Sequence, residues 1–171
     1  MFAYRPDVTQ GDITAVIERT GGMARRDTPS VSHHNVDMVR LAYDVAWPQR
    51  SLEGFQDRFA EDFTWRQRPE WPGRSAYGRD EMPELWADLD ETFAEYALTA
   101  VDYVDAGDYV VVTVHTSACL RAIHDVVEGT VWHVWRIRDG LAAEACVYGT
   151  REEAFDAAGF TQRKGRRLSR D

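Results

Sequence analysis

Residues 127–149, VEGTVWHVWRIRDGLAAEACVYG, constrain the fold most, because they have the pattern of two long strands folded back on each other. Gly140, in the dipeptide Asp139-Gly140, supplies the positive φ that a tight reversal needs. Large apolar and polar residues alternate on both sides of it with the period of two that half-buried strands show. One parity of the first strand comprises Val131, His133, Trp135 and Ile137. With this parity facing inward, a single imidazole lies among aromatic and aliphatic groups, which predicts a lined pocket.

The bulk composition predicts one cytoplasmic domain. A chain of 171 residues, 44% of them hydrophobic and 12% aromatic, is long enough to bury a core of its own. The net charge of −9 argues against a nucleic-acid binder, whose surface would be basic. Cys119 and Cys146 lie on different predicted strands without zinc-site spacing, so we expect two reduced thiols and no metal. No apolar run approaches the ~20 residues of a membrane span, and the first residues lack the apolar core of a signal peptide.

The order of the remaining elements predicts an α+β domain between two flexible ends. Residues 1–32 are expected to be a flexible extension, residues 33–160 the domain, and residues 161–171 a flexible basic tail. The domain should open with a helix capped by Ser32 or Asn35 and ended by Trp47-Pro48.

A second helix is expected at Ser51–Phe59, from the 3–4 spacing of its apolar residues, and a third at Asp80–Phe93. Strands are expected at residues 63–68, 96–104 and 109–120, followed by the opening hairpin and a short helix at Glu152–Ala158. Most of the helices come first in the chain and most of the strands follow, an order that predicts helices packed on one face of the sheet. A curved antiparallel sheet wrapped around three N-terminal helices would leave a conical cavity beside His133.

Several short segments, in this order, resemble the SnoaL-like branch of the nuclear transport factor 2-like superfamily. They are FAEDF, YGRDEM, VDAGDYVVV, HVWRIRDG and REEAFDAAGF, and the resemblance covers about residues 36–159. It implies a cone-shaped α+β barrel, commonly a homodimer through the outer sheet face, with a pocket near the first helix. Relatives include ketosteroid isomerases, polyketide cyclases, scytalone dehydratase and epoxide hydrolases, and also proteins that only bind or scaffold, so the fold does not define the function.

The resemblance assigns family positions to three residues of this sequence. Tyr43 falls where ketosteroid isomerases keep a tyrosine that hydrogen-bonds the developing oxyanion. Gln67 falls at the position of their general-base aspartate, and His133 at that of their second acidic residue. Both carboxyl groups are therefore replaced, and an amide cannot shuttle protons at neutral pH. The isomerase mechanism is not supported, and no carboxylate of the polyketide cyclase kind is found at these inward positions.

His133 is the leading catalytic candidate, with Tyr43 as its hydrogen-bond donor partner. An ordinary imidazole pKa near 6.5 makes a histidine a usable acid or base at cellular pH. The alternative is a neutral core histidine that is hydrogen-bonded to Tyr43 or Gln67. Predicted to contact a substrate are Trp65, Gln67, Trp86, Phe93, Trp135, Ala145 and Val147. The aromatic members suit a flat ligand, although core packing explains them equally well.

Other polar residues carry weaker functional hypotheses. Arg66, Arg68, Arg74 and Arg79 surround the loop after the first strand and can recognise an anion, whereas a solvated loop with acidic neighbours is the alternative. His115 has the outward parity and is expected at a dimer interface.

Two functions remain open from the sequence. The first is a SnoaL-like protein that binds a small apolar or aromatic molecule and possesses, if it is an enzyme, a cofactor-free isomerase, cyclase or dehydratase activity. The other is a non-catalytic dimeric binding or scaffold domain whose cone is filled by its own tryptophans. The number of titratable groups facing the cavity discriminates between them.

Overall fold

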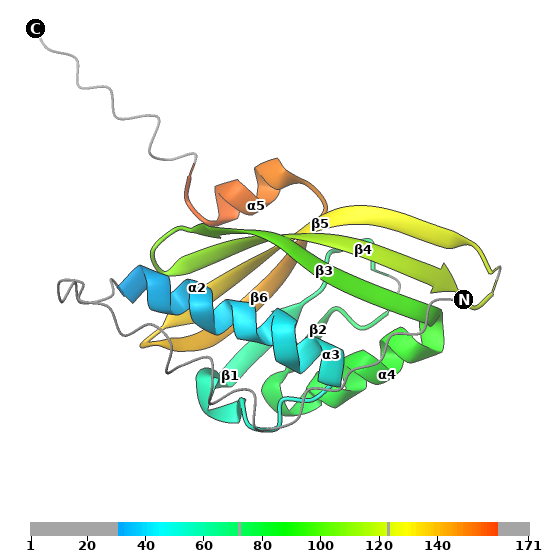
Figure 1. Cartoon of the computed structure of the whole chain (residues 1–171), viewed down its shortest axis with the longest axis horizontal. Coiled ribbons are helices and arrows are strands. Elements are labelled where there is room, and N and C mark those ends of the chain that lie inside the picture. The colour runs from blue at the N-terminus through cyan, green and yellow to red at the C-terminus, as the bar shows by residue number, and fades with distance from the viewer. Residues whose placement is uncertain (1–30, 72, 123, 161–171) are drawn as a thin grey trace, which may run out of the picture.

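A computed structural model of the chain describes residues 31–71, 73–122 and 124–160. Its centre is one six-stranded sheet with the order β2-β1-β6-β5-β4-β3 (Figure 1). The strands are β1 Phe59–Arg66, β2 Ala76–Gly78, β3 Phe93–Asp105, β4 Tyr109–Leu120, β5 Val126–Arg138 and β6 Leu141–Tyr148. The α+β prediction is confirmed. The expected antiparallel pairing is corrected at β1 and β6, which run parallel, because the chain between them is long enough to return in the same direction.

The β5–β6 hairpin forms as its sequence predicts. Asp139 and Gly140 have φ values of 54° and 77°, and they reverse the chain between Arg138 and Leu141. A two-residue turn with both φ angles positive matches the twist of the strands that it joins. The predicted inward parity of β5 is confirmed as well, since Val131, His133, Trp135 and Ile137 lie on the side of the main core.

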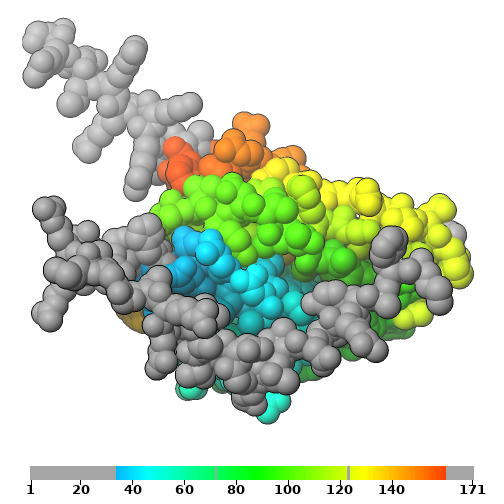
Figure 2. All heavy atoms as spheres, in the orientation of Figure 1, coloured from blue at the N-terminus to red at the C-terminus, as the bar shows by residue number. Residues whose placement is uncertain are grey.

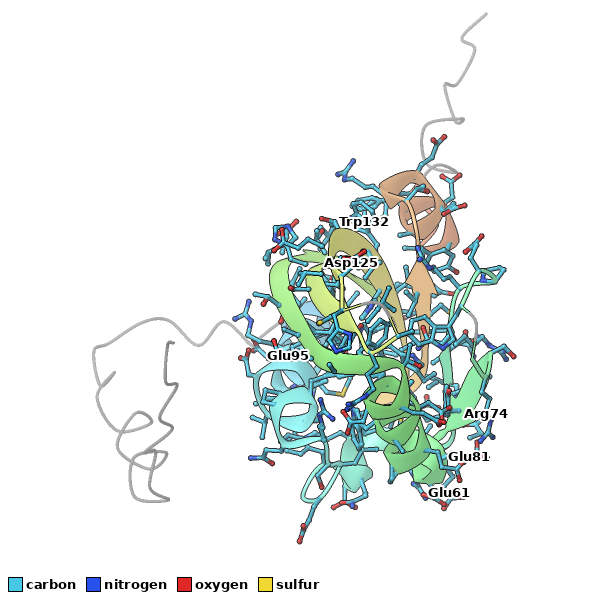
Figure 3. All side chains as sticks on the ribbon, turned by 90° about the vertical axis from the view of Figure 1, so that its right-hand side faces the viewer. Glu61, Arg74, Glu81, Glu95, Asp125 and Trp132 are labelled. Atoms are coloured by element: carbon cyan, nitrogen blue, oxygen red, sulfur yellow. The ribbon has the colours of Figure 1, made fainter. Side chains whose placement is uncertain are left out.

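The two faces of the sheet carry different helices. Helix α4 (Met82–Thr92) and the N-terminal helix pack on the inner face, and α5 (Arg151–Ala157) packs on the outer face (Figure 1). Trp132, which is adjacent to His133 in sequence, points to the side of α5 (Figure 3). The Thr150 hydroxyl accepts a hydrogen bond from the Glu153 N–H and caps α5.

The first helix is longer than expected. It consists of α2 (Val31–Leu41), one widened π-helical turn (Ala42–Ala46) and α3 (Trp47–Gln49), and it runs beside β3 (Figure 2). The predicted end at Trp47-Pro48 is therefore wrong, because the widened turn pairs the Trp47 N–H with the carbonyl of Ala42 and carries Pro48 onward. The helix ends at Arg50, whose φ is 50°.

Asn35 lies inside α2 and does not cap it. Its side chain is buried, and Nδ2 donates to the carbonyl of Gly107 at 3.1 Å, in the turn between β3 and β4. One of the two residues predicted to cap the helix instead fastens it to the sheet.

The second helix predicted at Ser51–Phe59 does not form. Gly54 adopts a φ of 79°, which a right-handed helix excludes, and only Gln56–Arg58 form a single 3₁₀ turn before β1 begins at Phe59. Leu52 and Phe59 are nevertheless buried in the main core. Phe55, which gives the sequence its 3–4 spacing, packs against the same core. The spacing therefore reflects core contacts made by a turn and not by a helix.

The third predicted helix is confirmed. A 3₁₀ turn at Arg79–Glu81 precedes α4, and the Glu81 carboxylate accepts a hydrogen bond of 2.7 Å from the Gly78 N–H. Met82, Leu85, Trp86 and Leu89 form the buried face of α4. Fully burying one such side chain contributes roughly 1.5–3 kcal/mol, so this face anchors α4 to the sheet.

The two predicted flexible ends lie almost entirely outside the described residues. The expected flexible extension at residues 1–32 falls outside the described residues except for its last two, which belong to α2, and the expected tail at residues 161–171 lies outside them entirely. Within the described ranges, no helix combines the length and the apolar character that crossing a membrane requires.

Candidate functional site

A cavity of about 230 Å³ opens between the inner face of the sheet and the elements that cover it, and it reaches His133. Its wall is mostly apolar and aromatic and comes from α3, β1 and the loop after it, α4, and strands β3 to β6. The apolar and aromatic members include Trp47, Trp65, Trp71, Leu89, Phe93, Tyr96, Leu98, Val131 and Val147. The polar members are Gln67, Arg68, Thr116 and His133. The exposed side chain of Val127 lies at its rim.

His133 is held by a short chain of hydrogen bonds that starts in the core. Trp135 Nε1 donates to the Tyr43 hydroxyl at 3.0 Å, and that hydroxyl lies 2.6 Å from His133 Nδ1. Burial raises the pKa of Tyr43 well above its usual value, so the phenol keeps its proton. Among the described residues, Nδ1 is the only acceptor within hydrogen-bond distance of the Tyr43 hydroxyl, so the phenol proton goes to Nδ1. The proton of a neutral His133 therefore resides on Nε2, the nitrogen left for the cavity.

Burial also fixes the charge of His133. The side chain is 2% exposed, and desolvation lowers its pKa to about 3. The imidazole is therefore neutral at cellular pH and is a weak base. In this state it offers a fixed N–H donor to whatever occupies the cavity. The site is better suited to polarising an acceptor group than to abstracting a proton.

Two indole groups of the cavity wall are also unsatisfied donors. Trp65 Nε1 and Trp71 Nε1 are buried, and neither finds a hydrogen-bond acceptor within the described part of the chain. Trp65 is 2% exposed, and its ring meets that of His133 edge to face at a centroid distance of 5.0 Å. A buried N–H without a partner costs roughly 1–3 kcal/mol. The wall is thus rich in donors that lack an acceptor.

The four arginines around the loop after β1 have separate surroundings. Three of them pair with carboxylates, namely Arg66 with Glu144, Arg74 with Glu81 and Glu84, and Arg79 with Asp80. The pair of Arg74 and Glu81 lies beside the lower part of the sheet (Figure 3). Arg68 lines the cavity instead, and none of the described carboxylates forms an ion pair with it. The four residues therefore do not form one anion site.

The structure brings together some of the sequence-predicted site residues and separates others. His133, Trp65, Gln67, Phe93 and Val147 line the cavity. Tyr43, Trp135 and Ala145 are buried behind it in the core, and Trp86 lines a neighbouring depression beside Trp47. Tyr43 therefore supports His133 and is not itself positioned to donate to a ligand.

The cavity also includes residues that sequence reasoning did not select. Trp71 returns to the wall from the Pro-rich loop, because its N–H bonds the Arg68 carbonyl at 3.0 Å. Tyr96 lies on β3 and stacks on Phe93 at a centroid distance of 5.2 Å. The parity of β3 was the available signal for Tyr96, whereas no local pattern indicates where a loop tryptophan packs.

His115 lies on the outer face of the sheet, as its parity predicts. Together with Thr99 and Thr130 it lines a shallow groove of about 440 Å³ across β3, β4 and β5. Among the described residues, no three histidine, cysteine, aspartate or glutamate side chains gather in a metal-binding group. Cys119 and Cys146 are both free thiols.

Comparison with protein families identifies one match. A family model described as a SnoaL-like domain matches residues 39–145, which is more than half of the chain and includes most of the cavity wall. A search of curated proteins finds no significant match.

Solved structures share the fold at low sequence identity. A nuclear transport factor 2-like protein from Burkholderia pseudomallei is 23% identical, with a TM-score of 0.59 over 72% of this chain and 95% of that one. TerC, co-crystallised with polyporic acid, is 17% identical, with a TM-score of 0.59 over 74% of this chain and 98% of that one. A putative SnoaL-like polyketide cyclase from Jannaschia sp. CCS1 is 19% identical, with a TM-score of 0.56 over 80% and 96% of the two chains.

Proposed function

Since this chain belongs to the SnoaL-like domain family, we propose that it binds a small, mostly apolar aromatic compound in the cavity beside His133. The observation that carries this proposal is the cavity itself, because a cone filled by its own tryptophans would leave no room for a ligand. Aromatic walls with a few fixed polar groups are typical of small-molecule sites. TerC, which has the same fold, was co-crystallised with a small organic compound.

The volume of the cavity limits the size of the ligand. An apolar cavity of about 150 Å³ holds one benzene molecule, so a cavity of about 230 Å³ suits one ring or two fused rings. Trp65, Trp71 and Phe93 offer ring faces and edges against which a flat compound can stack. A larger polycyclic compound would require the rim around Val127 to move.

Catalysis is a second candidate function, favoured by the neutral imidazole of His133 at the cavity. A ligand carbonyl placed against the Nε2 proton would be polarised, which supports a cofactor-free isomerisation, cyclisation or dehydration. No carboxylate lines the cavity among the described residues, and an imidazole with a pKa of about 3 is a poor base at neutral pH. These two facts favour binding over proton-transfer catalysis.

Filling the cavity should abolish binding. In Val131→Trp, the enlarged side chain occupies space at the cavity wall, and we expect affinity for one- and two-ring aromatic compounds to fall at least tenfold. Glu152→Trp adds the same ring on the exposed surface of α5 and should leave binding unchanged. Native mass spectrometry of the purified proteins, alone and with a panel of such compounds, measures both.

The outcomes of this experiment separate the candidate functions. Retention of the same compounds at the same affinity by Val131→Trp would refute the cavity proposal. Binding by none of the proteins would favour the non-catalytic scaffold. Conversion of a bound compound to a dehydrated or isomeric product, lost when the cavity is filled, would establish catalysis.

We propose in addition that two copies of the chain associate through the outer sheet face. The groove lined by Thr99, His115 and Thr130 lies on that face, away from the cavity. Light scattering should then give twice the chain mass of 19.5 kDa. Thr99→Arg, which places a charge in the groove of each copy, should shift the mass to that of one chain. A wild-type protein that scatters as a single chain would contradict the dimer.

A further inference from the structure

Arg68 places a positive charge in a cavity whose wall is otherwise mostly apolar and aromatic. The residue is half-buried and lines the cavity, whereas its three neighbouring arginines each have a carboxylate partner. The part of the wall that the structure describes contains no carboxylate. A guanidinium in this setting attracts an anion, and it does so within a protein whose net charge is −9.

The position of Arg68 is fixed by the loop in which it lies. The Gln67 N–H bonds the Ser75 carbonyl at 2.9 Å, and the Trp71 N–H bonds the Arg68 carbonyl at 3.0 Å, so both ends of this turn are fastened. Arg68 Nη1 lies 3.6 Å from the place that a Cβ would take on Gly149, which locates the guanidinium beside the end of β6. Its field also acts on the hydroxyl of Tyr96, another member of the wall.

Two further N–H donors of the cavity wall are more deeply buried than Arg68. His133 and Trp65 are each 2% exposed and therefore deep, and the indole N–H of Trp65 has no acceptor among the described residues. Arg68, which is half-buried, is the most accessible of the three. The cavity wall thus combines a cationic group that is partly exposed with neutral N–H groups that are buried, and it also contains aromatic rings.

We propose that the cavity binds an aromatic acid whose carboxylate pairs with Arg68 and whose ring system extends toward His133. This inference rests on the proposed ligand-binding function and specifies its ligand class. An acceptor such as a carbonyl or hydroxyl oxygen on the far side of the ring system would meet the N–H group of His133. Amides and esters of the same size lack the charge that Arg68 binds.

The test compares two probes of nearly equal shape, 2-naphthoate and 2-naphthamide, by isothermal titration. The wild-type protein should bind the acid at least tenfold more tightly than the amide. Arg68→Gln should remove this preference while changing the affinity for the amide less than about twofold, because the aromatic wall remains. Arg66→Gln is the matched control, since Arg66 is also an arginine of this stretch but pairs with Glu144 outside the cavity. It should retain the preference.

The results distinguish this inference from the function on which it rests. Equal binding of acid and amide by the wild type, or an unchanged preference in Arg68→Gln, would overturn the role of Arg68. If Val131→Trp still abolished both affinities, the cavity would stand as the ligand site. Failure of the wild type to bind either probe would count against both proposals. Circular dichroism of Arg68→Gln and Arg66→Gln should match the wild type, because neither side chain belongs to the core.

Discussion

Acidification from pH 6.5 toward pH 3 is expected to remove about 4 kcal/mol of folding free energy through His133 alone. Burial lowers the pKa of His133 in the folded protein to about 3, whereas an unfolded chain has an imidazole pKa near 6.5. Between these values the unfolded state binds a proton that the folded state does not. The stability from this residue is therefore complete above pH 6.5 and is lost as the pH falls, at roughly 1.4 kcal/mol per unit.

Urea unfolding at several pH values, followed by tryptophan fluorescence, measures this loss. His133→Gln is the comparison, because an amide keeps an acceptor for the Tyr43 hydroxyl and does not titrate. Between pH 6.5 and 4.5 the wild type should lose about 2–3 kcal/mol more than the variant. The ion pair with Arg138 and the hydrogen bond from Gly78 lower the carboxyl pKa of Asp62 and Glu81 respectively, but both proteins share these groups. Parallel pH profiles would show that His133 titrates normally.

Trp135→Ala should lower the free energy of unfolding by about 3–5 kcal/mol at neutral pH, the cost of truncating a buried aromatic side chain. Trp135 is 2% exposed, and its ring packs against those of Tyr43, Phe63 and Trp65 at centroid distances of 6.1, 6.1 and 5.9 Å. The substitution also removes the hydrogen bond that Nε1 donates to the Tyr43 hydroxyl.

Trp135→Phe separates the two contributions. It keeps an aromatic ring and loses the N–H, so we expect a smaller cost, dominated by the missing hydrogen bond of about 1 kcal/mol and the volume difference. Chemical denaturation of both variants at pH 7.5 gives the comparison. Equal losses in the two variants would show that the hydrogen bond and not the packing of the ring carries the stability of this position.

The alternation of apolar and polar residues along single strands predicted which side chains of the central sheet face the core. His133 and Trp135 share one face of β5, and Val112 and Val114 share the same face of β4, because side-chain direction repeats every two residues wherever a strand is regular. The same rule does not hold along β6. The register between β5 and β6 shifts between Arg136 and Ile137, so Ala142 and Ala145 both face the main core. A bulge depends on the pairing of two strands and leaves no signal in one of them.

The error in the predicted second helix has a similar origin. Leu52 and Phe59 have helical spacing, but Gly54 takes a conformation that ends any helix there, and both side chains reach the core by another path. For the cavity, His133 was found from the sequence because a polar residue interrupts an apolar face. Trp71 was not singled out, and Arg68 was named only with three other loop arginines as an anion site, because the place of both residues in the wall depends on backbone hydrogen bonds of a loop.

The widened turn at Ala42–Ala46 makes the contact between Tyr43 and His133 depend on the length of the chain as well as on its side chains. A π-helical turn contains one residue more than the α-helical turn that it replaces. Deleting one residue there would leave four residues in that turn, the α-helical number, so Met38 and Val39 before it could keep their places in the core. The residues inside the turn would be redistributed about the helix axis, and Tyr43 is one of them. The support of His133 is thus sensitive to a single-codon deletion that leaves the flanking helical segments in place.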